Sequence, residues 1–201
     1  MTTTESKIVI PQHAGTDRRR FLRGAGIATL SATAIAVLGS REALAQAMKG
    51  DMSKDVGILN VVLGLEHEAI AAYQIGAESK LLKGPVLGVA VMFQGHHKEH
   101  RDALVATIQK FGGKAVEAKG MKEYAEALNV NMIKSANDIL VLAAKLEKGA
   151  ANAYLGVIPA FSNGDLAKVS ARLAADETMH WTVLAQAIKE PLPAKALSFG
   201  A

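Results

Sequence analysis

Six carboxylate and imidazole side chains of this chain stand at spacings that suit metal binding. They are Glu66, His97, His100, Glu147, Glu177 and His180. His97 and His100 are three residues apart, as are Glu177 and His180, so on a helix each pair projects from successive turns of one face. The sequence contains no cysteine, which excludes a thiolate zinc site, an iron–sulfur cluster and a cysteine nucleophile. Any metal chemistry must therefore use nitrogen and oxygen donors.

The elements that must position these side chains are helices. Aromatic residues make up 4% of the 201 residues and there are only 5 prolines, a composition that favours packed helices over a β-sandwich. The apolar periodicity predicts four long helices and one short amphipathic helix, at residues 53–80, 86–111, 134–161, 164–189 and 122–128.

The residues between these helices indicate how they connect. Short breaks at residues 83–85 and 163–165 join the first helix to the second and the third to the fourth. Gly112-Gly113 ends the second helix and opens a long, lysine-rich connection to the third. Ser53 and Asp55 are placed to cap the first helix. We therefore expect an all-α fold, an antiparallel four-helix bundle with a long crossover between its second and third helices.

The chain repeats itself in a way that supports this plan. Leu65–Tyr73 aligns with Leu146–Tyr154 at an offset of 81, and both the glutamate and the tyrosine recur. His97–Leu104 aligns with Glu177–Leu184 at an offset of 80. The sequence thus predicts two helix hairpins of one design laid end to end.

The face on which the polar residues lie predicts where they point. Glu66 falls on the apolar stripe of its helix with Leu63 and Ile70, and Glu147 repeats the arrangement in the third helix. A buried carboxylate is retained only if it is paired, protonated or metal-bound. We therefore expect the six side chains to converge on one interior layer and to bind metal there.

Other interpretations of these residues stay open. Glu66 and Glu147 can instead be exposed helix carboxylates that pair with lysine, and His180 can be a hydrogen-bonded core histidine. The two histidines of the second helix can lie on a polar face, because their neighbours offer competing registers. These neighbours are His96, Glu99 and Asp102.

Two tyrosines and two polar residues accompany the predicted ligands. Tyr73 and Tyr154 are interpreted as core aromatics whose hydroxyls bond to the glutamate layer, in preference to redox relays. His67 and Glu68 are interpreted as facing solvent or as supporting the ligands from outside the layer.

At this point the sequence resembles the ferritin-like superfamily of di-iron carboxylate proteins, over essentially all of residues 46–201. That family takes one glutamate from each of two helices and a Glu-x-x-His step from each of the other two. Glu66, Glu147 and the Glu177–His180 step match in order, whereas His97 stands where a glutamate is usual. Among the branches of the family, the sequence is most similar to the exported, desiccation-related one. The resemblance implies two metal ions, with iron expected and manganese or zinc possible.

The histidine at position 97 has an electrostatic consequence. Three glutamates carry three negative charges against the four positive charges of two divalent ions, so one positive charge stays uncompensated in a poorly solvated interior. Oxidation to the trivalent state is then harder, and a dinuclear or a mononuclear site is compatible with the ligand set. Metal identity stays open.

Two functions follow from the resemblance. One is a di-metal oxidoreductase that uses dioxygen or peroxide, as a ferroxidase or a peroxidase or catalase does. The alternative is an exported, non-catalytic stress or desiccation-related protein whose metal site is structural or vestigial. Iron storage in a cage is disfavoured because the tail leaves no room for a fifth helix.

Residues 1–45 resemble a twin-arginine export signal. Arg18-Arg19-Arg20-Phe21-Leu22-Arg23 precedes a mildly apolar run of about 16 residues, shorter than the about 20 that a spanning helix needs. Ala43-Leu44-Ala45 offers a cleavage site. We expect the twin-arginine machinery as a partner, cleavage near Ala45, and a periplasmic or otherwise exported bundle domain of residues 46–201. Because that pathway carries folded cargo, a metal loaded before export is expected.

The remaining charge and apolar patterns bear on other partners. The first 45 residues hold six of the 23 basic and three of the 19 acidic residues, so the rest of the chain is close to neutral and nucleic-acid binding is not expected. No later segment is judged apolar enough to span a membrane, so no stable insertion is expected after cleavage. The apolar stretch 139–142 suggests a possible homodimer.

Overall fold

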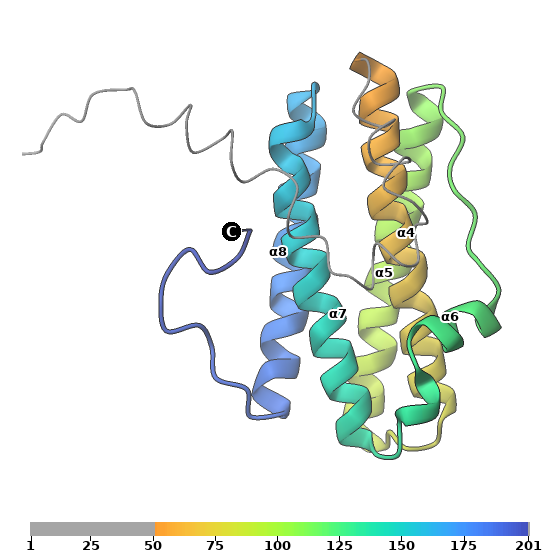
Figure 1. The fold of residues 1–201 in the computed structure, drawn as a ribbon, viewed down its shortest axis with the longest axis vertical. Coiled ribbons are helices and arrows are strands. Elements are labelled where there is room, and N and C mark those ends of the chain that lie inside the picture. The colour runs from red at the N-terminus through yellow and green to blue at the C-terminus, as the bar shows by residue number, and fades with distance from the viewer. Residues whose placement is uncertain (1–50, 201) are drawn as a thin grey trace, which may run out of the picture.

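The computed structural model describes residues 51–200, with side chains from residue 53. Within that range four long helices form an antiparallel bundle (Figure 1), which confirms the predicted fold class. They are α4 (Asp51–Glu78), α5 (Gly84–Lys110), α7 (Ala136–Val157) and α8 (Gly164–Ala187). The crossover holds α6 (Met121–Ala127) and the 3-10 turn η1 (Val130–Met132), and a second turn, η2 (Ile158–Ala160), follows α7. The predicted export signal lies outside the described residues.

Local sequence signals set the helix ends. Pro85 stands in the first turn of α5, where its missing N–H is not needed. Ser135 and Asp138 form a capping box at the start of α7, and the Asn163 side chain accepts a hydrogen bond from the backbone N–H of Asp165 at the start of α8. Gly112 follows α5 with a φ of 72°, a left-handed conformation that glycine adopts without steric cost.

Asp55 does not cap the first helix, so that prediction is wrong. Since α4 already begins at Asp51, Asp55 lies inside it and is buried. Its carboxylate oxygens accept hydrogen bonds from the backbone N–H groups of Ser162 and Asn163, at 2.8 and 3.1 Å. The side chain thereby ties the start of α4 to the turn between α7 and α8.

The crossover is fixed along the outer side of α4. The Asn60 side chain donates to the carbonyl of Lys114 at 3.0 Å and accepts from the N–H of Val116 at 2.7 Å. Two turns further on, the Nε2 atom of His67 lies 3.1 Å from the carbonyl oxygen of Val116. His67 therefore serves this connection and points away from the bundle interior.

Two apolar clusters fill the bundle above and below a polar layer. One cluster packs Tyr73 and Phe93 against Trp181. The other packs Leu63 and Leu104 on residues of α7 and α8. On each long helix the predicted ligands fall between the residues of the two clusters, so the apolar packing seals the polar layer from both ends.

Two observations bear on the expectations about membrane insertion and a homodimer. Contrary to expectation, the stretch Ser53–Glu78 is long and apolar enough by length and composition to cross a membrane. It contains an 18-residue window with a mean hydropathy of 1.3, and 67% of that window is buried inside the bundle. In the stretch 139–142, Ile139 is buried in the chain's own core and only Val141 is exposed. Leu140 and Leu142 are half-buried, and the homodimer stays a prediction.

Candidate metal centre

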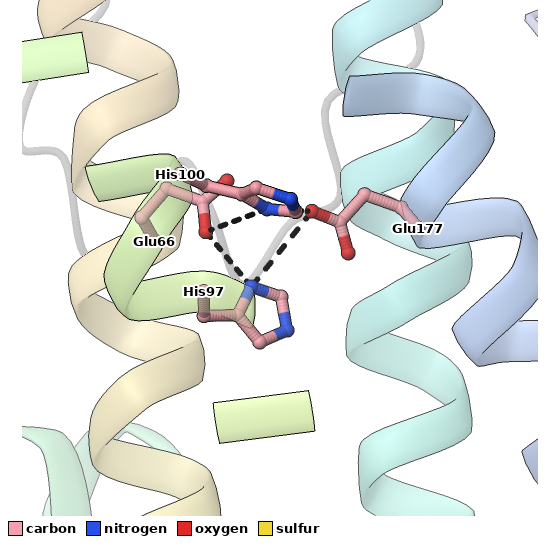
Figure 2. A group of neighbouring side chains, drawn as sticks. All are labelled: Glu66, His97, His100 and Glu177. Carbon is pink, nitrogen blue, oxygen red and sulfur yellow. Dashed lines mark hydrogen bonds and ion pairs between the residues drawn. The ribbon is translucent and has the colours of Figure 1, made fainter. Parts of the chain in front are cut away.

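The structure brings all six predicted side chains together in the middle of the bundle. They form two groups of four, and within each group the candidate ligand atoms lie within 4.8 Å of one another. One group joins Glu66, His97, His100 and Glu177 (Figure 2), and the other joins His97, Glu147, Glu177 and His180. His100 is 8% exposed and the other five are at most 2% exposed. The interpretation of Glu66 and Glu147 as exposed carboxylates is therefore excluded.

The first group gathers at the Oε2 atom of Glu66. The Nδ1 atoms of His97 and His100 lie 2.8 and 3.7 Å from this oxygen. The same two nitrogens lie 3.8 and 3.1 Å from Oε1 of Glu177. Two carboxylates and two imidazoles from α4, α5 and α8 therefore face a common point.

The second group lies on the other side of the His97 ring. Its Nε2 atom is 3.1 Å from Oε1 of Glu147. His180 places Nδ1 3.3 Å from Oε2 of Glu147 and 3.3 Å from Oε2 of Glu177. Glu177 thus gives one oxygen to each group, and His97 turns one ring nitrogen to each.

In the absence of a metal ion, protonated histidines balance the negative charges of the glutamates in this layer. Burial alone lowers the pKa of His97, but the charges of Glu177, Glu147 and Glu66 raise it well above its usual value. Burial is outweighed in the same way at His100 and His180, where glutamate hydrogen bonds and charges raise the pKa to about 10 and about 9.

The pKa values of Glu66 and Glu147 are lowered, whereas the pKa of Glu177 is raised. Burial raises the pKa of Glu66, but the neighbouring imidazoles outweigh it and lower the value to about 2. They also hold the pKa of Glu147 well below its usual value. At Glu177 burial prevails and raises the pKa to about 7, and its Oε2 atom makes no hydrogen bond to any described residue. The shared carboxylate is therefore the least satisfied ligand of the layer.

The donor set fits divalent first-row metals. Three carboxylates and three imidazoles suit iron, manganese or zinc, and one carboxylate shared between two groups is compatible with a pair of ions. Glu177 Oε2, buried without a hydrogen bond, is the kind of atom that a cation would satisfy. The residues present therefore fit a metal site.

Comparison with known proteins identifies the family of this chain. The sequence profile of a ferritin-like domain family matches residues 54–190. The chain belongs to the ferritin-like family. Its fold is similar to the crystal structure of a conserved hypothetical protein from Mycobacterium tuberculosis, with a TM-score of 0.58, 22% identity, and coverage of 71% of this chain and 96% of that one. A search of the curated proteins found no match.

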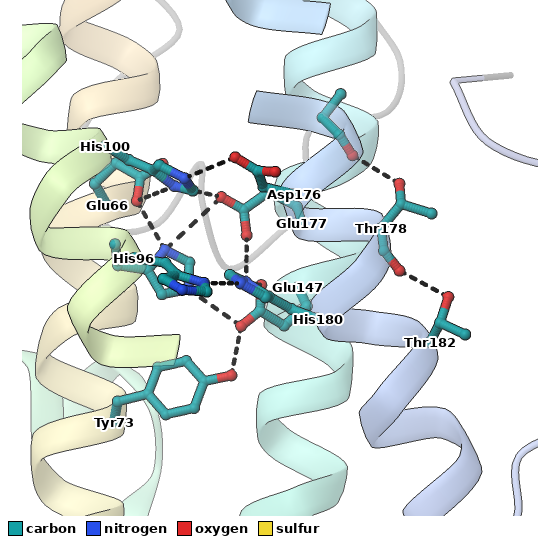
Figure 3. A network of polar contacts seen from close by, with 12 residues as sticks. Glu66, Tyr73, His96, His100, Glu147, Asp176, Glu177, Thr178, His180 and Thr182 are labelled. Atoms are coloured by element: carbon teal, nitrogen blue, oxygen red, sulfur yellow. Dashed lines mark hydrogen bonds and ion pairs between the residues drawn. The ribbon is translucent and has the colours of Figure 1, made fainter. Parts of the chain in front are cut away.

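In this ferritin-like protein two tyrosines cross the bundle to hold the glutamates. The Tyr73 hydroxyl on α4 donates to Oε1 of Glu147 on α7 at 2.5 Å (Figure 3), and the Tyr154 hydroxyl on α7 donates to Oε1 of Glu66 on α4. Burial and then the neighbouring glutamate charge raise the pKa of both tyrosines well above its usual value. Both therefore stay protonated donors, as the sequence analysis expects.

Removal of either hydroxyl should weaken one half of the centre. We expect Tyr73→Phe and Tyr154→Phe each to lower metal affinity about tenfold, because a ligand carboxylate loses the partner that orients it. Tyr124→Phe is the matched control, since its hydroxyl bonds to the N–H of Lys119 outside the layer. Equilibrium titration with Mn²⁺ measures the change. Equal metal affinities in all three variants would show that the hydroxyls of Tyr73 and Tyr154 do not orient the glutamates and that the two rings only fill space in the core.

Two residues outside the predicted ligand set contact the outer nitrogens of His100 and His180. His96 places Nδ1 2.9 Å from Nε2 of His180, and Asp176 places Oδ2 3.2 Å from Nε2 of His100 (Figure 3). His96 and Asp176 occupy matching positions of the repeat, 80 residues apart and each directly before a predicted pair. Each contacts a histidine of the other hairpin. The repeat does not specify which side chains they contact. These contacts use the Nε2 atoms of His100 and His180, so the Nδ1 atoms of both rings face the glutamates.

A groove gives solvent a path to this outer edge. It holds about 600 Å³ between α5 and α8, and its walls include His96, His100, Asp176 and His180. Glu99 and Arg172 stand among its other polar residues. Water and small solutes can therefore approach the centre from the α5–α8 side, in contrast to the two ends that the apolar clusters close.

Glu68 does not face solvent, which corrects one of the two expectations for it. Its side chain is 3% exposed and its Oε1 atom makes no hydrogen bond within the described residues. Burial raises the pKa of Glu68 to about 7, and the charge of Lys119 opposes the rise. Periodicity along α4 did not reveal this burial, because α7 and the crossover cover the position.

Proposed function

We propose that this ferritin-like protein holds two divalent cations, iron or manganese, and supports redox chemistry with dioxygen or peroxide. The observation that carries the proposal is the sharing of Glu177 between two four-residue groups, one oxygen to each. A single structural ion would need only one of these groups.

The described residues divide between the two cations. Glu66 and His100 would hold one, Glu147 and His180 the other, with Glu177 shared between them. His97 turns a nitrogen to both, but a neutral imidazole offers only one free lone pair, so it would serve one cation at a time. A pair of redox-active ions would supply electrons to dioxygen or peroxide.

The chain's own residues then have separate tasks. The tyrosine hydroxyls orient Glu66 and Glu147, and the apolar clusters exclude water from both ends of the layer. The α5–α8 groove admits small oxidants to the outer edge of His100 and His180. Because three glutamates leave one positive charge uncompensated, the centre should resist oxidation more than a four-glutamate site does.

Metal binding should release protons. The raised pKa values of His97, His100 and His180 keep these imidazoles charged at pH 7 without metal, whereas a ligand imidazole must be neutral. We expect release of about three protons from the imidazoles and up to one more from Glu177, whose pKa is about 7, and a rise in metal affinity as the pH rises from 6 toward 9. Titration in weakly buffered indicator solution counts the protons. Release of less than one would show that the histidines are not ligands.

Turnover tests the redox part of the proposal. The reduced, iron-loaded protein is mixed with dioxygen or hydrogen peroxide, and the zinc-loaded protein serves as the redox-inert control. We expect a transient absorbance change and consumption of several equivalents of oxidant by the iron form only. No consumption beyond the first equivalent would overturn a catalytic role.

A non-catalytic site is the second candidate, and one observation favours it. The hydrogen bonds and ion pairs between the histidines and glutamates already balance most of the layer without any ion. A vestigial or structural site in an exported stress-related protein would then suffice. In that case metal should raise the thermal unfolding midpoint, while iron and zinc forms should be equally inert toward peroxide.

Export by the twin-arginine pathway is proposed from the leader sequence alone. A fusion of residues 1–45 to a reporter that is active only when exported in folded form tests it, with Arg18→Lys, Arg19→Lys and Arg20→Lys combined as the control. Equal reporter activity outside the cytoplasm in both fusions would refute this route.

A further inference from the structure

A second, smaller pocket reaches the centre from the α4–α7 side, away from the α5–α8 groove. It holds about 20 Å³, enough for one water-sized particle. Its polar lining consists of Glu68, His97 and Glu147, and Leu65, Leu146 and Ala150 supply apolar walls. The pocket therefore joins the buried Glu68 to two of the candidate ligands.

Glu68 breaks the internal repeat at this pocket. The offset of 81 places Gly149 at the corresponding position of α7, and Gly149 also lines the pocket. One hairpin thus contributes a carboxylate and the other leaves space for it. The repeat alone does not require a carboxylate here, since its counterpart has no side chain.

One oxygen of the buried Glu68 carboxylate has no hydrogen-bond partner among the described residues. The side chain is 3% exposed, and its Oε1 atom makes no hydrogen bond to any described residue. A buried carboxylate without such a bond is costly unless it is protonated or meets a cation. Since the pocket opens to His97 and Glu147, a cation held by Glu68 would lie next to the centre.

We propose that Glu68 is the carboxylate of a third cation site, through which a divalent cation passes between the α4–α7 side and the Glu147 half of the centre. The proposal rests on the proposed function, because the cation's destination is the Glu/His layer. The positive charge of Lys119 also acts on Glu68, so this site holds a cation more weakly than the centre does. A cation that is held weakly by Glu68 can leave again for the Glu147 half of the centre.

Cobalt loading of the metal-free, full-length protein tests the proposal. Stopped-flow absorbance follows Co²⁺ entering the histidine-containing centre of the wild type, Glu68→Gln and Glu126→Gln. The last variant makes the same change on exposed α6. We expect Glu68→Gln to load at least about tenfold more slowly than the other two, because the carboxylate no longer attracts the cation into the pocket. Its final spectrum should equal that of the wild type.

A second variant tests the route without touching the carboxylate. Ala150→Leu places a larger side chain in the pocket wall and should slow loading to a similar degree, while circular dichroism and thermal unfolding verify the fold. Wild-type loading rates in either variant would overturn the third site, as would an altered final spectrum in Glu68→Gln. Failure of the wild type to develop any cobalt spectrum would instead contradict the proposed function.

Discussion

Substitution of Glu177 by glutamine should abolish binding of the second metal ion and weaken the first at least about a hundredfold. Loss of a partner that merely orients a ligand already costs about ten- to a hundredfold in affinity, and Glu177 directly faces both groups of candidate ligands. The substitution keeps the side-chain volume and removes the charge that the two proposed cations would share. Isothermal titration of the metal-free protein with Mn²⁺ or Fe²⁺ gives both stoichiometry and affinity.

The matched control for this experiment is Glu99→Gln. Glu99 is exposed on the wall of the α5–α8 groove, so its charge is near the centre without belonging to it. We expect it to bind metal as the wild type does. Two ions bound to Glu177→Gln with unchanged affinity would contradict a shared carboxylate.

The His97→Glu variant should bind two divalent ions about a thousandfold more tightly in total than the wild type, and iron bound to it should be easier to oxidise. A fourth carboxylate balances the four positive charges, and one added charge about 4 Å from a cation contributes about 4 kcal/mol at an effective dielectric constant of about 20. Without metal, four buried carboxylates would face only two imidazoles. We therefore expect the metal-free variant to unfold at a lower temperature than the wild type.

His67→Glu is the control for the His97 substitution. It makes the same chemical change on the outer side of α4, where His67 contacts only the carbonyl of Val116 among the described polar groups. Redox titration of the iron forms and differential scanning calorimetry of the metal-free forms measure the two effects. Identical redox behaviour of His97→Glu and the wild type would show that position 97 does not set the charge balance.

Most of the fold and the burial of the six candidate ligands could be predicted, because they depend on the periodicity within each helix and on the internal repeat. The apolar stripe of α4 already contains Glu66, and the repeat at an offset of 81 places Glu147 at the same level of α7. Their burial follows from the faces that any bundle must turn inward. The structure agrees, with Glu66 and Glu147 each 1% exposed.

The contacts that could not be predicted join elements distant in sequence. His96 reaches His180 because of the rotation of α5 against α8, and the repeat does not specify that rotation. Asp55 bonds to a turn 107 residues away, and no local pattern distinguishes it from a helix cap. Glu68 is buried by α7 and by the crossover, whose path an irregular, lysine-rich sequence does not define.

Anomalous diffraction from crystals soaked in Mn²⁺ tests the central claim most directly. Two metal peaks are predicted in one layer, the first among Glu66, His100 and Glu177 and the second among Glu147, His180 and the same Glu177 carboxylate. Absence of both peaks from this layer in crystals saturated with the metal, or peaks confined to surface carboxylates, would contradict the account.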